Sequence, residues 1–248
     1  MAFDHALNST KTLLSLHSLM AGLRHDLFYT FLHRSASGLA DLGDSSESCN
    51  WTIRTSLLSS ESVVYSAGVG RDISFEHALA DRFGMKILLL DPSPTGLETM
   101  KKLEHQRKEF EFLPVALAGH EGELFLSPPG NPEEGSWVSE ISQSGSRIAN
   151  AEMVNVKCET VSSLMRKFGH THVDLLKIDI EGAEYGVLEA IMESGAHIRQ
   201  IAVEFHNGVL PGIPRSLTIR TLIKLYRHGY RIVHKGGSNH TLCLASEL

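Results

Sequence analysis

Three residues in the C-terminal half of the chain could carry out proton chemistry: Asp179, Glu204 and His206. Each lies at or just after the end of an apolar run that is typical of a buried strand. Ligands of open α/β sheets bind outside the carboxyl ends of the strands, so we expect these side chains to meet at one site. Glu204 and His206 are two residues apart and share one face of their strand.

Each of these residues also has a purely structural interpretation. Asp179 could cap the helix that follows it, His206 could be a packed histidine, and Glu204 could pair with Lys177. The convergence of several polar strand ends is therefore more informative than any one residue. The turn after Asp179 reads Ile-Glu-Gly, and not the Pro-Pro-Tyr or Pro-Pro-Phe of enzymes that methylate exocyclic amines. A Gly-x-Ser-x-Gly run, which would mark a hydrolase, is absent from the sequence.

A glycine-rich turn follows an earlier apolar run. Residues 63–65 predict a strand, and Gly68 and Gly70 come directly after it. Glycines at these positions allow a tight turn and the close approach of backbone to a ligand. Asp72 and Ser74 can cap the helix that we expect next. This strand, turn and helix are typical of the start of a nucleotide-binding α/β domain.

Two further positions indicate which nucleotide the turn would bind. Asp91 ends the next apolar run, 23 residues after Gly68, where such folds place an acid that accepts from ribose hydroxyls. A dinucleotide fingerprint needs Gly or Ala where this chain has Ile73, so a nicotinamide cofactor is disfavoured. The Gly-Lys-Ser/Thr of a phosphate-binding loop is also absent from the sequence. S-adenosylmethionine, a common cofactor with a ribose and no phosphate, suits this pattern. The alternative is a plain βαβ unit without a ligand.

The composition is that of an ordinary globular protein. The 248 residues are 42% hydrophobic and 21% charged, which fits one α/β domain with an extension. The net charge of -6 argues against nucleic acid as the main partner. The three cysteines form no CxxC pair, and no apolar run approaches the roughly 20 residues of a membrane span. Without a signal-peptide pattern, the sequence predicts a cytoplasmic location.

The sequence predicts two parts, an N-terminal helical extension over residues 1–45 and a cofactor-binding domain over residues 46–248. Apolar residues recur at helical spacing over residues 9–34, and the resulting apolar face could pair two copies in a homodimer. Residues 35–50 are rich in Ser, Gly and Asp, so we expect a linker there.

Strand and helix signals alternate through the larger part. Helical segments separate five predicted strands, near residues 62–66, 86–90, 111–117, 173–179 and 201–206. This alternation implies a mostly parallel sheet covered on both faces. We also expect a short strand near 121–126, an edge strand near 154–158 and a closing antiparallel hairpin over 230–245. Residues 127–150, which contain Trp137, form a polar stretch of the length that lids and binding loops have.

These motifs resemble the FkbM-type family of S-adenosylmethionine-dependent methyltransferases. The resemblance covers about residues 51–245, and its most specific run is Leu-Lys-Ile-Asp-Ile-Glu-Gly-Ala-Glu at 176–184. It implies an α/β class I methyltransferase fold, a Rossmann-like sheet of seven mostly parallel strands with an antiparallel last strand. Many members have Asp where this chain has Ser66, so one charge near the cofactor is missing. The cofactor-binding residues that the resemblance implies are Ser66, Ala67, Gly68, Gly70, Asp72, Ser74, Asp91, Pro92 and Asp179.

The resemblance also implies methyl transfer to a hydroxyl of a small-molecule acceptor, a sugar or natural product. An alcohol is a poor nucleophile, so a base should take its proton as the new bond forms. The candidate bases are His206 and Asp179, with Glu204 orienting the imidazole. In a competing version, a divalent metal ion binds Asp179, Glu204 and the acceptor hydroxyls. The sequence permits that ion without requiring it, so no metal ligand is assigned. The alternative functions are a cofactor-binding protein without turnover and an NAD-dependent oxidoreductase.

Overall fold

The computed structural model describes residues 27–44, 49–129, 135–139, 153–208, 210 and 212–248. The chain divides into two compact units, Met1–Arg34 and Ser35–Leu248, which we consider separately. In the first unit, residues 27–32 are helical. The remainder of the helices predicted over residues 9–34, and with it most of the face proposed for a homodimer, lies outside the described residues.

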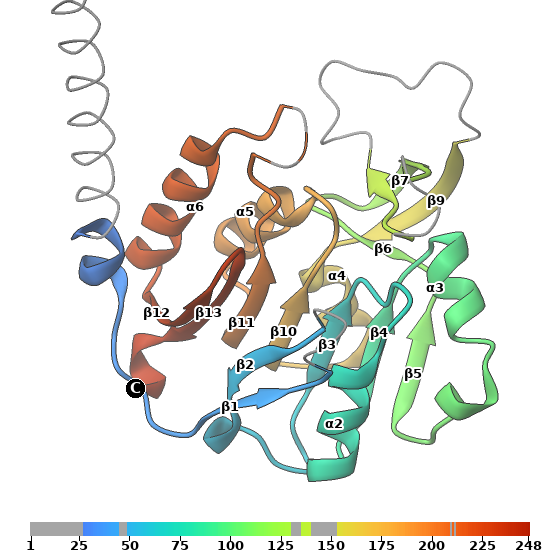
Figure 1. The fold of residues 1–248 in the computed structure, drawn as a ribbon, viewed down its shortest axis with the longest axis horizontal. Coiled ribbons are helices and arrows are strands. Elements are labelled where there is room, and N and C mark those ends of the chain that lie inside the picture. The colour runs from blue at the N-terminus through green and yellow to red at the C-terminus, as the bar shows by residue number, and fades with distance from the viewer. Residues whose placement is uncertain (1–26, 45–48, 130–134, 140–152, 209, 211) are drawn as a thin grey trace, which may run out of the picture. The chain divides into compact units, whose positions relative to one another are not determined.

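The second unit is built on a seven-stranded sheet with the order β12-β13-β11-β10-β3-β4-β5 (Figure 1). Strand β13 is antiparallel to both of its neighbours, and the other six strands run in one direction. The predicted closing hairpin, β12 with β13, is confirmed. The strands are β3 Val64–Ala67, β4 Ile87–Leu90, β5 Phe110–Leu113, β10 Val173–Ile178, β11 Ile198–Glu204, β12 Tyr230–Gly236 and β13 Asn239–Leu244.

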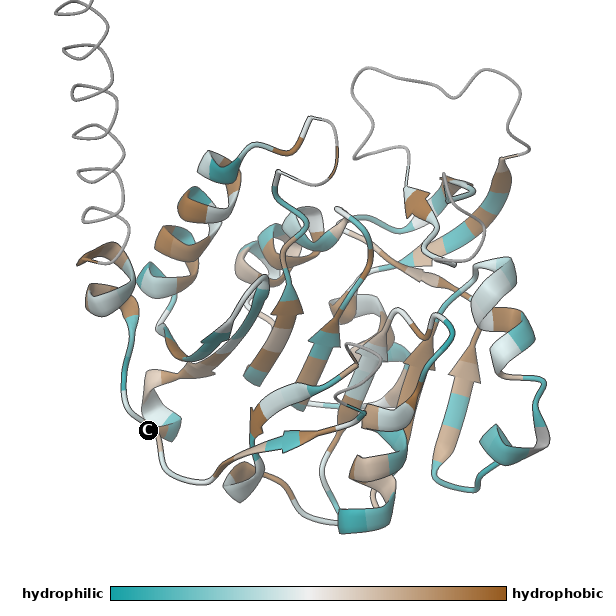
Figure 2. Cartoon of the chain, in the orientation of Figure 1, coloured by the Kyte–Doolittle hydropathy of each residue, from teal (hydrophilic) through white to brown (hydrophobic). Residues whose placement is uncertain are grey.

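The central strands are buried along their whole length. Every residue of β3, β4 and β10 is buried, and β4 is a continuous brown band in Figure 2. Unbroken burial is expected for parallel strands that are covered on both faces. Helix α5 packs against α4 and α6, whereas α2 contacts β1. The helices are α2 Ser74–Phe83, α3 Pro94–Thr99, α4 Val161–Phe168, α5 Glu184–Ser194 and α6 Arg215–Arg227.

The strands predicted near 121–126 and 154–158 are confirmed, but they belong to a second, four-stranded sheet that was not foreseen, and the strand near 154–158 is an inner strand rather than an edge. The order of this sheet is β6-β9-β7-β8, with the strands β6 Ala116–Leu117, β7 Gly122–Ser127, β8 Val138–Ser139 and β9 Val154–Glu159. The single strand predicted over 111–117 is wrong, because β5 ends at Leu113 and β6 pairs with β9 in the other sheet. Pro114 lies between them, and a proline cannot donate a backbone hydrogen bond to a ladder.

The linker predicted over residues 35–50 is also wrong in part. Strand β1, Leu39–Leu42, pairs antiparallel with β2, Trp51–Arg54. Trp51 and Ile53 alternate with more exposed residues and belong to the main hydrophobic core, so β2 is anchored by burial. The described residues also form short 3-10 helices at Thr55–Leu57, Leu103–His105 and Ala245–Glu247.

Candidate functional site

A cavity of about 410 Å³ lies where several strands of the large sheet end. Its walls include the segments that follow β3, β4, β10 and β11, which is the edge where open α/β sheets bind ligands. Leu117, Leu124 and Leu126 from the small sheet supply an apolar wall, and Trp137 from the long polar stretch lines the same space. The Trp137 indole N–H donates to Thr95 Oγ1 at 3.2 Å, which fixes the ring at this wall.

The cavity brings together most of the residues that the sequence singled out. Its lining includes Gly68, Gly70, Asp72, Asp91, Pro92, Asp179, Glu204 and His206. Ser66, Ala67 and Ser74 do not line it. The Ser66 hydroxyl instead donates to Glu76 Oε1 at 2.5 Å, and Ser74 Oγ accepts from the backbone N–H of Asp44. Their direct role in cofactor binding stays a prediction.

The glycine turn has one tight side and one open side. Gly68 has φ 87°, and a Cβ there would lie 1.8 Å from the backbone oxygen of Asp179. Gly70 has φ 57°, and a Cβ there would meet no protein atom within 4 Å. The first glycine therefore lets the turn pack against the end of β10, and the second leaves space in the cavity.

Asp91 fixes this turn from the neighbouring strand. Its Oδ2 accepts from the backbone N–H groups of Val69 and Gly70, both at 3.0 Å, and its Oδ1 accepts from Ser93 N–H at 2.8 Å. A carboxylate has about four acceptor positions, so these three bonds leave capacity for one more donor. The predicted contact with a ribose hydroxyl stays a prediction, and Asp91 has a structural role that the sequence did not indicate.

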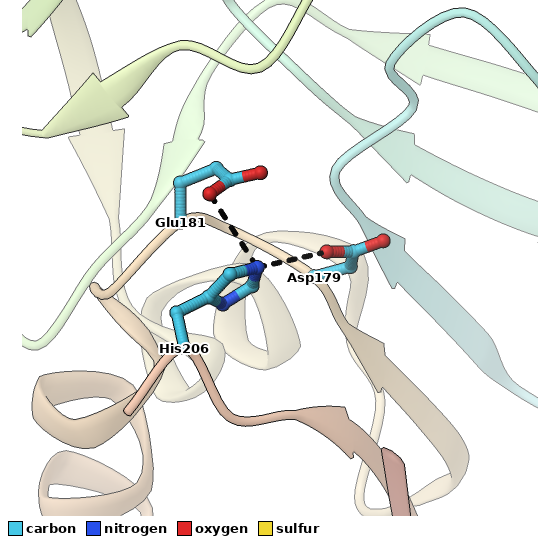
Figure 3. A group of neighbouring side chains, drawn as sticks. All are labelled: Asp179, Glu181 and His206. Carbon is cyan, nitrogen blue, oxygen red and sulfur yellow. Dashed lines mark ion pairs between the residues drawn. The ribbon is translucent and has the colours of Figure 1, made fainter. Parts of the chain in front are cut away.

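Asp179, Glu181 and His206 form the polar centre of the cavity (Figure 3). His206 Nε2 lies 3.8 Å from Asp179 Oδ1 and 3.4 Å from Glu181 Oε2. Asp179 and Glu181 follow β10, and His206 follows β11, so adjacent parallel strands bring them together. Glu181 was not among the predicted site residues. It has φ 48°, a left-handed conformation that non-glycine residues rarely adopt and that often marks functional positions.

The carboxylate beside the imidazole Nδ1 is that of Glu184, and the orienting role expected of Glu204 stays a prediction. Glu184 is fully buried, and its Oε1 accepts from the backbone N–H of His206 at 2.9 Å and lies 3.5 Å from His206 Nδ1. Its Oε2 accepts from Gly182 N–H. Glu204 instead accepts a hydrogen bond from Ser238 Oγ at 2.8 Å. Glu184 is the first residue of α5, and the turn after β10 places it against His206. Sequence spacing alone does not show this contact.

The site geometry can be compared with known proteins. The family described as Methyltransferase FkbM domain matches residues 57–232, a range that contains every residue of the cavity centre. The chain belongs to this family. The match supports methyltransferase activity for the FkbM domain and confirms the resemblance seen in its motifs.

Other comparisons add little to this assignment. A solved structure titled "Crystal structure of monomeric WbdD" covers 74% of this chain at 12% identity, with a TM-score of 0.41. The match covers 36% of that structure's chain. A search of curated proteins found no match. Among the described residues of the FkbM protein, no helix has the length and apolar character needed to cross a membrane.

A buried lysine links the glycine turn of the FkbM domain to its polar centre. Lys177 Nζ donates to the backbone oxygen of Gly68 at 2.7 Å and lies 3.5 Å from Asp179 Oδ2. Burial lowers the pKa of Lys177, but the carboxylates of Asp179 and Glu76 outweigh burial and raise it. Lys177 therefore stays charged, and its ion pair is with Asp179 rather than with Glu204, the alternative considered from the sequence.

The charge state of His206 determines what it can do in the site. Burial lowers the pKa of this imidazole, but Glu184, Glu181 and Asp179 raise it by more than burial lowers it. The resulting pKa is about 9. His206 therefore carries a proton at neutral pH and acts as a donor and a cation. A protonated imidazole has no free nitrogen to accept a proton, so the base role predicted for His206 requires the ring to lose its proton first, and that role stays a prediction.

The raised pKa of His206 has a measurable consequence in metal-free protein. The folded value of about 9 lies above the ordinary 6.5, so the imidazolium stabilises the fold fully below pH 6.5, and this stabilisation is lost as the pH rises through 9. We expect His206→Gln to remove a pH-dependent contribution of about 3 kcal/mol. Denaturant unfolding at pH 6 and pH 9 would measure it, with the exposed His228→Gln as control. An equal pH dependence in wild type and His206→Gln would contradict the expectation.

Proposed function

We propose that the FkbM domain is an S-adenosylmethionine-dependent methyltransferase that methylates a hydroxyl group of a small molecule, a sugar or natural product. One observation carries the proposal: the glycine turn after β3 and the Asp179, Glu181 and His206 cluster line one cavity. The sheet supports it, since seven strands with only β13 antiparallel are the arrangement expected for a class I methyltransferase.

The residues at the cavity wall fit such a cofactor. The open side of Gly70 leaves room next to the turn, and Asp91 retains acceptor capacity for a ribose hydroxyl. The leucines of the small sheet and Trp137 offer an apolar surface for a planar base. When bound, S-adenosylmethionine supplies a methyl group that its sulfonium makes reactive.

The chain's own groups then act on the acceptor. We propose that Asp179 accepts the hydroxyl proton, which is general-base catalysis and contributes typically about 10² to 10⁴-fold. Protonated His206 lies beside Asp179 and Glu181 and balances their charge, and Glu184 fixes the ring. Positioning of the acceptor oxygen in line with the methyl group contributes further to the rate enhancement. Trp137 lies where it can cover the acceptor.

A calorimetric titration tests the cofactor class. Purified full-length protein is titrated with S-adenosylhomocysteine, and in parallel with NAD⁺. We expect micromolar binding of S-adenosylhomocysteine alone, which would justify a screen of hydroxylated acceptors. Binding of NAD⁺ alone would overturn the inference drawn from Ile73. Binding of neither would favour a fold without turnover, and the proposal would then fail.

A further inference from the structure

We propose that Asp179, Glu181 and His206 form a binding site for one divalent cation of the Mn²⁺ type. Each residue offers one ligand atom, and these atoms all lie within 4.8 Å of one another. An ion about 2.1 Å from each ligand places neighbouring ligand atoms about 3 Å apart and opposite ones about 4.2 Å apart. The distances from His206 Nε2 to the carboxylates, 3.4 Å and 3.8 Å, lie between these limits.

The imidazole distinguishes this cluster from a group of surface acids. The His206 side chain is 9% exposed, and its Nε2 points at both carboxylates (Figure 3). Its Nδ1 has no hydrogen-bond partner among the described residues, because the Glu184 oxygen at 3.5 Å is too distant for a good bond. Nδ1 faces the buried Glu184 carboxylate, so Nε2 is the ring nitrogen available to an ion between the two acids.

The second layer of residues already has the arrangement that metal sites use. A metal-bound histidine usually donates its other N–H to a carboxylate, which fixes the ring and its tautomer. Glu184 Oε1 is the carboxylate on the Nδ1 side, and two backbone N–H groups hold it there. Asp179 is similarly anchored, since its Oδ2 faces Lys177 while its Oδ1 faces His206.

The ligand types indicate the class of ion. One nitrogen and two carboxylate oxygens suit a cation that accepts both, such as Mn²⁺, better than Ca²⁺, which takes oxygen ligands. Three protein ligands leave up to three octahedral positions open, and all three residues line the cavity. This set differs from the ion considered from the sequence, because Glu181 and His206 replace Glu204.

The open positions suggest a role, and this part rests on the proposed methyltransferase function. An acceptor hydroxyl that binds the ion has a lower pKa and loses its proton more readily. With an ion bound, Asp179 would be a ligand rather than the base, and the more acidic acceptor hydroxyl would lose its proton to solvent water. An acceptor with two neighbouring oxygens could occupy two of the open positions at once.

Manganese binding to full-length, EDTA-treated protein tests the site without cofactor or acceptor. Electron paramagnetic resonance should show one Mn²⁺ per chain, with coupling to a histidine nitrogen that His206→Gln removes. Glu181→Gln should weaken binding by at least about 10-fold, and Glu184→Gln by about 10 to 100-fold, the usual cost of losing a second-layer partner. Glu121→Gln, an exposed acid paired with Arg166, is the control and should bind as wild type does.

The possible results distinguish a failure of the metal site from a failure of the proposed methyltransferase function. No stoichiometric Mn²⁺, or equal affinity in wild type and Glu181→Gln, would overturn the metal site and leave S-adenosylhomocysteine binding untouched. Weaker binding in Glu204→Gln but not in Glu181→Gln would also overturn it, because the ion would then lie on the other carboxylate. Mn²⁺ binding without S-adenosylhomocysteine binding would support the site and contradict the methyltransferase.

Discussion

Gly68→Ala is expected to lower the free energy of unfolding by about 3 kcal/mol or more, the range of severe single substitutions. Its Cβ would lie 1.8 Å from the backbone oxygen of Asp179, so the turn and the end of β10 would have to separate. The residue also has φ 87°, which adds strain for any side chain. Denaturant unfolding of the purified variant measures the loss.

Gly70→Ala is the matched control, because it changes the same residue type in the same turn. Its Cβ meets no protein atom within 4 Å, so only the positive φ of 57° costs stability, about 1 kcal/mol. The added methyl group faces the cavity, so we expect S-adenosylhomocysteine affinity to fall more than stability does. Equal loss of stability in both variants would show that the packing of Gly68 on Asp179 is not what makes that glycine necessary.

Asp179→Asn is expected to reduce methyl transfer by about 10² to 10⁴-fold, whether the carboxylate acts as a base or binds an ion. The amide keeps the shape of the side chain but removes the charge that faces both His206 and Lys177. Turnover is measured with a hydroxylated acceptor found by the screen, together with the melting temperature of the variant.

Two controls make the result on Asp179 interpretable. Glu189→Gln removes an exposed carboxylate of helix α5 that pairs with Lys224 and does not line the cavity, and it should leave turnover unchanged. Binding of S-adenosylhomocysteine to Asp179→Asn shows whether the cavity stays intact. Wild-type turnover in both Asp179→Asn and His206→Gln would disprove the assignment of the chemistry to this cluster.

Much of the large sheet could be predicted from the sequence, because its signals are local. Buried parallel strands such as Ile87–Leu90 are continuous apolar runs, and the glycines between β3 and α2 mark a turn that no other residue type fits as well. Two strands of the small sheet, β7 and β9, were predicted, but β6 and β8 have only two residues each, and Pro114 divides a run that otherwise looks continuous.

The site was predicted in outline but not in its contacts. Strand ends identified Asp179 and His206, since parallel strands place their carboxyl ends at one edge. The sequence could not show that Glu181 and Glu184 converge on His206, because the direction of each acid depends on the turn after β10 and on its left-handed residue. Glu204 ends β11, two residues before His206, yet its partner Ser238 comes from the closing hairpin.

The central claim is that the cavity beside the glycine turn binds S-adenosylmethionine, and a crystal structure with S-adenosylhomocysteine tests it most directly. We expect the product between the turn and Trp137, with a ribose hydroxyl on Asp91 and its sulfur facing the Asp179, Glu181 and His206 cluster. A product bound elsewhere, or an empty cavity at saturating concentration, would contradict the claim.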